Sequence, residues 1–219
     1  MEKQVKIKIC GLRTPADVAA VNAALPEYAG FIFVPMRRRY VAPAQAAILC
    51  QQLDPRIRPV GVFVDARVED ILEVLEHCPL DMVQLHGAED DDYIARLRAA
   101  YRTRFAVERP DAAVDSELCI VKAFRVEDAD DIRRAEASAA DEILLDHGAG
   151  GTGERFDWTL LQHCRRRFFL AGGLDPDNVE DAIHVAQPYA VDVSSSLETD
   201  GRKEPEKIRR FVSAVRRSL

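Results

Sequence analysis

Short hydrophobic runs recur along the whole chain, and segments with apolar residues at helical spacing separate them. Runs of this length, bounded by glycine, proline or polar residues, are typical of strands buried on both faces of a parallel sheet. The pattern predicts eight strands, at residues 5–10, 29–34, 60–64, 82–87, 118–124, 143–145, 168–173 and 189–193.

Helix signals follow the predicted strands. Thr14-Pro15-Ala16-Asp17 supplies an N-cap, a first-turn proline and an early acid. Apolar residues between 68 and 75 recur at i, i+3, i+4 and i+7, Asp175-Pro176 opens another helix, and 156–161 form a short one. Eight strand–helix units predict an α/β protein with the closed (β/α)8 architecture of a TIM barrel, as a single domain over residues 1–219.

A doubly wound sheet is the alternative arrangement of the same units. It would carry a glycine-rich dinucleotide fingerprint after its first strand. Cys10-Gly11-Leu12-Arg13 stands there instead, which favours the barrel.

Composition narrows the class of protein and of partner. The 219 residues are 47% hydrophobic, enough for a full core, yet no run of apolar residues is long enough for a membrane span, and no signal peptide is expected. The net charge of −7 disfavours nucleic acid and anionic membranes, but not a small phosphorylated ligand. The cysteines are dispersed, which argues against a disulfide framework or a zinc site and for a cytoplasmic protein; they are Cys10, Cys50, Cys78, Cys119 and Cys164.

The predicted barrel brings the ends of its strands together. Active sites of this fold lie at the carboxyl ends of the strands, and phosphate is usually bound after the seventh and eighth. The glycines and serines at that corner would provide backbone and hydroxyl donors, which indicates a phosphorylated small molecule. The strand-end residues are Cys10, Arg37 to Arg39, Asp65, Gln84, His86, Lys122, Asp146, Gly172, Gly173, Asp192, Ser194, Ser195 and Ser196.

Asp146 ends a buried strand and precedes a loop with four glycines in six residues. A carboxylate in this place, followed by a loop that can approach a ligand closely, is typical of an acid or base under a lid. The predicted lid consists of Gly150, Gly151, Thr152 and Gly153. The alternative is that Asp146 caps the next helix and the glycines only turn the chain.

Other strand-end residues also have two interpretations. A lone cysteine is usually a packing residue, but Cys10 stands at a strand end directly before a glycine. His86 lies in the site or caps a turn, and Lys122 reaches the pocket or pairs with a core carboxylate. Arg37 to Arg39 form a solvated loop or an anion clamp, since guanidinium suits a carboxylate. Arg165 to Arg167 precede a strand, at the opposite end, and are expected to be solvated.

Taken together and in order, several motifs resemble phosphoribosylanthranilate isomerase. They run from the first strand to the region before the last helix: Lys8-Ile9-Cys10-Gly11-Leu12, Pro35 through Arg39-Tyr40-Val41, Gly61-Val62-Phe63-Val64, Val83-Gln84-Leu85-His86-Gly87, Leu145-Asp146 with Gly150-Gly151-Thr152-Gly153 through Phe156-Asp157-Trp158, Leu170-Ala171-Gly172-Gly173-Leu174 with Pro176 and Asn178-Val179, and Val191-Asp192-Val193-Ser194-Ser195 with Glu198. The resemblance implies a TIM-barrel enzyme of tryptophan biosynthesis that needs no metal or organic cofactor. Its reaction is the Amadori rearrangement of N-(5′-phosphoribosyl)anthranilate.

The resemblance also implies roles for individual residues. Asp146 would be the general acid that protonates the ring oxygen, and Cys10, as thiolate, the general base that removes the C2′ proton. Arg39 would bind the anthranilate carboxylate. Gly172, Gly173, Ser194 and Ser195 would hold the phosphate, with Gln84, His86 and Asp192 on the sugar side.

Three positions depart from the family pattern. Arg13-Thr14 shifts a loop hydroxyl by one position, and His147 follows the proposed acid where a small residue is common. Ser196 stands where the family has glycine, which would cost up to a few kcal/mol if positive φ were needed there.

Two other functions compete with the isomerase. A metal-dependent sugar-phosphate epimerase would need histidine and carboxylate ligands, for which the strand ends offer His86, Asp65, Asp146 and Asp192. A non-catalytic barrel would not need both Cys10 and Asp146. The protein is expected to be a monomer or a homodimer.

Overall fold

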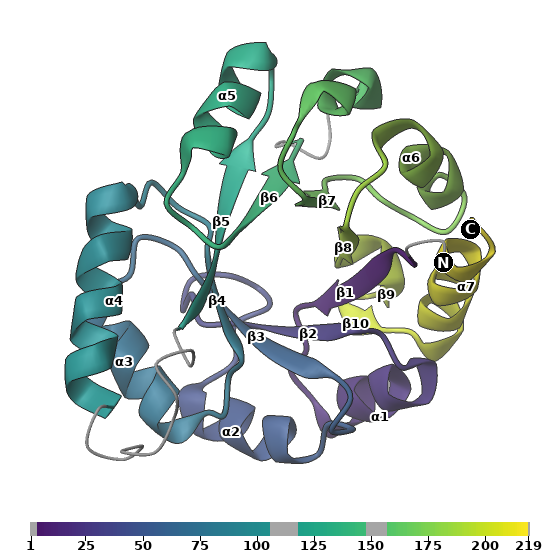
Figure 1. Ribbon diagram of the computed structural model, residues 1–219. Coiled ribbons are helices and arrows are strands. Elements are labelled where there is room, and N and C mark those ends of the chain that lie inside the picture. The colour runs from purple at the N-terminus through teal and green to yellow at the C-terminus, as the bar shows by residue number, and fades with distance from the viewer. Residues whose placement is uncertain (1–3, 106–117, 148–156, 219) are drawn as a thin grey trace.

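The structure, a computed structural model, describes residues 4–105, 118–147 and 157–218, and its eight parallel strands close into a barrel in chain order (Figure 1). Each strand pairs in parallel with the next, and β8 pairs with β1. This confirms the predicted (β/α)8 barrel. The strands are β1 (Lys6–Cys10), β2 (Tyr28–Ile32), β3 (Arg58–Phe63), β4 (Met82–Leu85), β5 (Cys119–Arg125), β6 (Glu142–Asp146), β7 (Phe168–Ala171) and β8 (Ala190–Val193).

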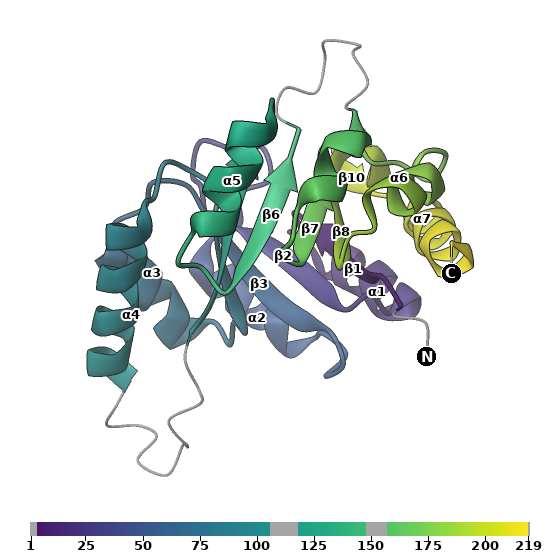
Figure 2. The same cartoon turned by 45° about the horizontal axis from the view of Figure 1, so that its top comes forward.

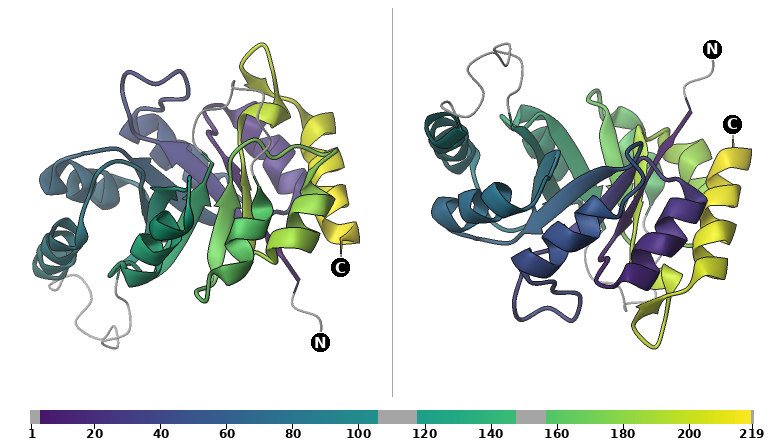
Figure 3. Two further views of the ribbon diagram at one scale, coloured as in Figure 1. Left: turned by 90° about the horizontal axis from the view of Figure 1, so that it is seen from above. Right: turned by 90° about the horizontal axis from the view of Figure 1, so that it is seen from below.

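Helices surround this barrel, as the turned views show (Figures 2 and 3). The first and last helices, α1 and α7, lie side by side against it. The α-helices are α1 (Pro15–Ala24), α2 (Pro43–Gln51), α3 (Val68–His77), α4 (Asp91–Phe105), α5 (Ala129–Ala137), α6 (Val179–Ala186) and α7 (Pro205–Arg217). Two 3-10 helices, η1 (Trp158–His163) and η2 (Ser195–Leu197), and a hairpin of β9 (Glu198–Thr199) and β10 (Arg202–Lys203) complete the described elements. None of the helices in the described part of the chain is long and apolar enough to cross a bilayer.

The predicted helix signals are confirmed at α1 and wrong in detail at α6. Thr14 caps α1 in a capping box, with the Asp17 amide 3.2 Å from Thr14 Oγ1 and the Thr14 amide 3.0 Å from Asp17 Oδ2. Thus the shifted hydroxyl caps a helix. The next predicted start, Asp175-Pro176, is instead a turn in which Asp175 Oδ1 accepts from the Asn178 amide (2.9 Å), so α6 begins at Val179.

Side-chain alternation along the strands separates two cores. One set of apolar side chains fills the barrel interior, and the other set lies between the strands and the helices. Interior residues include Tyr28, Val60, Met82, Val121, Leu144 and Phe169. Because successive side chains of a strand point to opposite faces, Cys10, Gln84, Asp146 and Asp192 share the interior face with these apolar residues, nearer the carboxyl ends. The barrel interior is therefore polar near the carboxyl ends of the strands and apolar farther from them.

The opposite end of the barrel corrects one prediction. Arg166, expected to be solvated, is half-buried and binds protein groups instead, whereas Arg167 is exposed as expected and also contacts protein groups. Arg166 Nη1 and Nη2 donate to the carbonyl oxygens of Ser138 (2.8 Å) and Ala140 (2.7 Å). Arg167 pairs with Glu142 and lies 4.6 Å from the centroid of the Tyr189 ring. A planar guanidinium can satisfy several acceptors and stack on an aromatic face at once, which explains why these residues are structural.

Candidate active site

A cavity of about 560 Å³ opens among the carboxyl ends of the strands. Every predicted catalytic and substrate-binding residue lines it: Cys10, Arg39, Gln84, His86, Asp146, Gly172, Gly173, Asp192, Ser194 and Ser195. The predicted lid residues Gly150, Gly151, Thr152 and Gly153 lie outside the described residues. The fold thus gathers side chains from both halves of the chain around one space large enough for a small molecule.

Cys10 ends β1 directly beside Gly30 of β2. A Cβ atom on Gly30 would lie 2.7 Å from the Cys10 sulfur and 3.1 Å from its Cα, so only glycine leaves room for the thiol. The sequence analysis missed Gly30. The signal that could have found it is a glycine inside an apolar strand, which often marks a close approach.

Burial raises the pKa of the Cys10 thiol, and neighbouring charges modify that effect. The ammonium groups of Lys8 and Lys203 act to lower this pKa, and the Asp192 carboxylate acts to raise it. Lys8 Nζ lies 2.9 Å from both carboxylate oxygens of Asp192, and only 1% of Lys8 is exposed. The thiol therefore lies beside a buried ion pair that the sequence analysis did not predict.

Asp146, at the end of β6, faces a histidine. Its Oδ2 lies 3.5 Å from His86 Nε2, and His86 Nδ1 lies 2.8 Å from Gln84 Nε2. The interpretation of His86 as a site residue is therefore confirmed in position. The oxygen of the Gln84 amide is buried and has no hydrogen-bond partner among the described residues. An unpaired buried acceptor at a cavity wall can accept a hydrogen bond from a hydroxyl group of a ligand.

Gly172 makes room for this carboxylate as Gly30 does for the thiol. A Cβ atom there would lie 2.7 Å from Asp146 Oδ1 and 2.7 Å from the His147 amide nitrogen, and its φ is +94°. The His147 ring, which departs from the family pattern, has Nδ1 3.4 Å from the Val126 carbonyl oxygen. The imidazole does not line the cavity.

Arg39 is held by a buried glutamate. Its Nε donates to Glu198 Oε1 (2.6 Å) and its Nη2 to Glu198 Oε2 (3.0 Å). The same carboxylate accepts from Arg38 (2.7 Å) and from Lys203 Nζ (3.1 Å). Three cations around one carboxylate leave this corner with excess positive charge, which suits an anionic group of a ligand. Lys203, whose side chain is only 1% exposed, was not predicted, because its place depends on the β9–β10 hairpin.

The predicted phosphate corner has free donors in its backbone, whereas the hydroxyls of two of its three serines are bound elsewhere. Gly172 and Gly173 both have positive φ, +94° and +65°, and neither donates its N–H to another of the described residues. By contrast, Ser194 Oγ donates to the Cys10 carbonyl oxygen (2.9 Å) and Ser196 Oγ to that of Leu174 (2.6 Å). Ser196 is not among the residues with positive φ, so serine replaces glycine there without strain.

Two strand-end residues lie outside the site. Lys122 points out of the barrel, where its Nζ binds the Gly87 carbonyl oxygen (2.6 Å) and Glu89 (3.3 Å), so the core-carboxylate interpretation is confirmed. Asp65 accepts from the Ala88 amide (2.6 Å). Within residues 4–105, 118–147 and 157–218, no three His, Cys, Asp or Glu side chains are grouped so that they could hold a metal ion.

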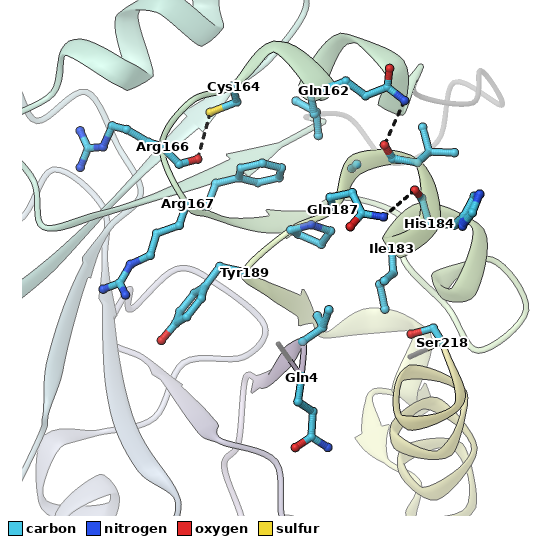
Figure 4. A pocket seen from close by; sticks show the side chains of 16 residues that line it. Gln4, Gln162, Cys164, Arg166, Arg167, Ile183, His184, Gln187, Tyr189 and Ser218 are labelled. Atoms are coloured by element: carbon cyan, nitrogen blue, oxygen red, sulfur yellow. Dashed lines mark hydrogen bonds between the residues drawn. The ribbon is translucent and has the colours of Figure 1, made fainter. Parts of the chain in front are cut away.

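A second cavity, of about 630 Å³, lies at the amino-terminal end of the barrel (Figure 4). Its wall contains residues that precede or begin strands, such as Gln4, Arg167 and Tyr189, together with the carboxyl ends of α6 and α7. None of the predicted site residues reaches it. The hydrogen bonds drawn there, such as Cys164 Sγ to the Arg166 carbonyl oxygen (3.4 Å), join wall residues to one another.

Known proteins are similar to this chain over nearly its whole length. The family model of N-(5'phosphoribosyl)anthranilate (PRA) isomerase matches residues 7–214. The chain belongs to the PRA isomerase family. The family match extends from the second residue of β1 to the last helix, and so includes every residue of the cavity described above.

Individual relatives agree with this membership. The chain is 42% identical to the N-(5'-phosphoribosyl)anthranilate isomerase of Lactiplantibacillus plantarum over 209 residues, 94% of this chain and 90% of that protein. The phosphoribosyl anthranilate isomerase of Thermotoga maritima has a similar crystal structure, with a TM-score of 0.83, 34% identity and coverage of 97% and 98% of the two chains. A PRA isomerase crystallised with reduced 1-(o-carboxyphenylamino)-1-deoxyribulose 5-phosphate gives a TM-score of 0.79, with 33% identity and the same coverage.

Proposed function

We propose that this chain catalyses the Amadori rearrangement of N-(5′-phosphoribosyl)anthranilate to 1-(2-carboxyphenylamino)-1-deoxyribulose 5-phosphate, a step of tryptophan biosynthesis. The observation that carries the proposal is the single cavity lined by Cys10, Asp146, Arg39 and the Gly172–Gly173 turn. It combines an acid, a base, a cationic corner and free backbone donors, which are the four features that this substrate requires.

Asp146 acts first, as general acid. Its carboxyl group gives a proton to the furanose ring oxygen, the bond between this oxygen and C1′ breaks, and the nitrogen lone pair forms a Schiff base. His86, 3.5 Å from the Asp146 carboxylate, and Gln84 behind it hold the acid in place. Gly172 supports the same geometry, since any side chain there would displace the carboxylate.

Cys10 acts second, as general base. Its thiolate removes the C2′ proton, the electron pair forms an enolamine, and the cationic nitrogen of the Schiff base becomes neutral. Protonation at C1′ and loss of the 2′-hydroxyl proton then give the ketone. Because β1 and β6 are not neighbours in the barrel, a sugar lying across the cavity can contact acid and base from different sides.

Two anionic groups of the substrate fix its orientation. The anthranilate carboxylate pairs with Arg39, whose Nη1 remains after Nε and Nη2 have bound Glu198. The phosphate accepts from the N–H groups of Gly172 and Gly173, with Ser195 beside them, while Ser194 keeps its hydroxyl on the Cys10 carbonyl oxygen. Asp192 closes the sugar side through its ion pair with Lys8.

The test is turnover of N-(5′-phosphoribosyl)anthranilate by the purified chain and by Cys10→Ser and Asp146→Asn. Each substitution removes a positioned proton-transfer group, and such groups contribute about 10²–10⁴-fold, so each should reduce kcat by at least 100-fold with folding unchanged. A double variant that turns over substrate near the wild-type rate would refute the assignment. Activity that disappears with a chelator and returns with metal would favour the epimerase instead.

The remaining proposals concern the protein as a whole. We propose that residues 1–219 form a single catalytic domain, working in the cytoplasm as a monomer or homodimer, with the loop at Gly150 to Gly153 as lid. Light scattering on the purified chain decides between the two oligomeric states. Complementation of a tryptophan auxotroph that lacks this isomerase tests the activity in cells.

A further inference from the structure

Lys8 is a buried cation placed next to the proposed base, with a role that the reaction scheme above leaves open. It precedes Cys10 by two residues in β1, so both side chains point into the barrel. Its Nζ is 2.9 Å from both carboxylate oxygens of Asp192. An ammonium group has three donors, and its two contacts with Asp192 leave at least one of them for the neighbouring sulfur.

The balance of positive and negative charge around the Cys10 thiol changes when the thiol ionises. With a neutral thiol, Lys8 and Asp192 balance each other. Once Cys10 is a thiolate, two anions share Lys8, because Lys203 is already bound to Glu198 (3.1 Å) and to the Ser194 carbonyl oxygen (2.8 Å). The charged or titratable groups that face Cys10 or share its cavity are Lys8, Lys203, Arg37, Arg38, Arg39, His86, Asp146 and Asp192. Gly30, beside Cys10 on β2, contributes none.

We propose that Lys8 is a positioning residue of the reaction: its ammonium, anchored by Asp192, is the countercharge that allows the Cys10 sulfur to carry a negative charge inside the barrel. The proposal rests on the proposed function for its catalytic meaning. Burial by itself opposes the thiolate. A cation beside the sulfur offsets this most effectively where solvent cannot screen it. Asp192 then has two opposed effects, since it fixes Lys8 and also repels the thiolate.

The experiment measures how fast iodoacetamide alkylates Cys10 as a function of pH, with peptide mass spectrometry to separate this cysteine from the other four. Only the thiolate reacts, so the midpoint of the profile reports ionisation of Cys10. A neighbouring opposite charge changes a pKa by about 1–3 units. Lys8→Met should therefore raise the midpoint by at least one pH unit and slow alkylation at neutral pH at least tenfold. Asp192→Asn should lower the midpoint.

Opposite shifts for the two partners of one ion pair are not expected from mere loss of packing. If Lys8→Met fails to fold because Asp192 is left unpaired, the double variant Lys8→Met/Asp192→Asn replaces it. Its midpoint must lie above that of Asp192→Asn. The proposal would be overturned if the midpoint of Lys8→Met were at or below that of the wild type, or if the midpoint of the double variant were at or below that of Asp192→Asn. Alkylation needs no substrate, so this failure is distinct from a failure of the wild-type chain to turn over N-(5′-phosphoribosyl)anthranilate.

Discussion

Replacing Gly30 with alanine should impair the proposed base, Cys10, without changing that residue itself. The added Cβ would stand 2.7 Å from the Cys10 sulfur and 3.1 Å from its backbone Cα, whereas ordinary contacts begin at 3.4 Å. The backbone of β1 is held on both sides by β2 and β8, so the thiol is the part that yields. The sulfur would have to move by at least 0.7 Å, the difference between 3.4 Å and 2.7 Å. A displacement of about 1 Å at a reacting group can cost about 100-fold in rate.

Gly30→Ala should reduce stability less than it reduces activity, and a control variant can separate the two effects. An additional methyl group in a packed core typically costs about 1–3 kcal/mol. Gly61 provides a matched control, because a Cβ there would lie 2.6 Å from Leu80 Cδ1, on the outer face of β3 and away from the cavity. Gly61→Ala should lower the melting temperature comparably and leave turnover nearly intact.

The assay is kcat and KM for N-(5′-phosphoribosyl)anthranilate, with thermal unfolding followed on the same preparations. Gly30→Ala should lose about 100-fold in kcat with KM changed much less, since the proton transfer is affected rather than substrate binding. If kcat for Gly30→Ala stays within threefold of the wild type while the protein is folded, the close approach of Gly30 to the thiol does not constrain the base, and the reasoning is refuted.

Three further outcomes are expected. Arg39→Ala should raise KM by roughly 10–100-fold, because a charge-assisted contact contributes about 1.5–3 kcal/mol to binding. Arg37 is exposed, so Arg37→Ala should change KM little. Equal effects of the two substitutions would indicate diffuse electrostatic attraction instead of a specific contact. Gly173→Val should raise KM and also destabilise the fold, since φ is +65° there although a Cβ would meet nothing within 4 Å; unfolding and kinetics measured together test both parts. Only the deprotonated Cys10 can act as base, and burial raises the pKa of its thiol. Therefore kcat/KM should still be increasing at about pH 8.5, the ordinary pKa of a thiol. A plateau of kcat/KM already reached at pH 7 would contradict this expectation.

The sequence by itself determined the eight strands and the end of the barrel at which chemistry occurs. Apolar runs and helical spacing are local patterns, and a parallel barrel brings all carboxyl strand ends to one face, so Cys10 and Asp146 had to share it. Observed strand limits differ slightly from the predicted ones, for instance at β7, where Gly172 leaves the sheet with positive φ.

The tertiary structure decided which groups surround those residues. Lys8 and Asp192 are 184 positions apart, and Arg39 and Glu198 are 159 apart, so their pairing exists only once the barrel has closed. Strand alternation sent Lys122 outward to Glu89, although it lies near a strand end. A glycine inside an apolar strand indicates a close approach, but no local pattern identifies the Cys10 sulfur as the group that approaches Gly30, because this depends on the register between β1 and β2. Hydrophobic periodicity specifies which face of a strand is buried, whereas the partners of a buried charge or thiol are set by how distant strands align.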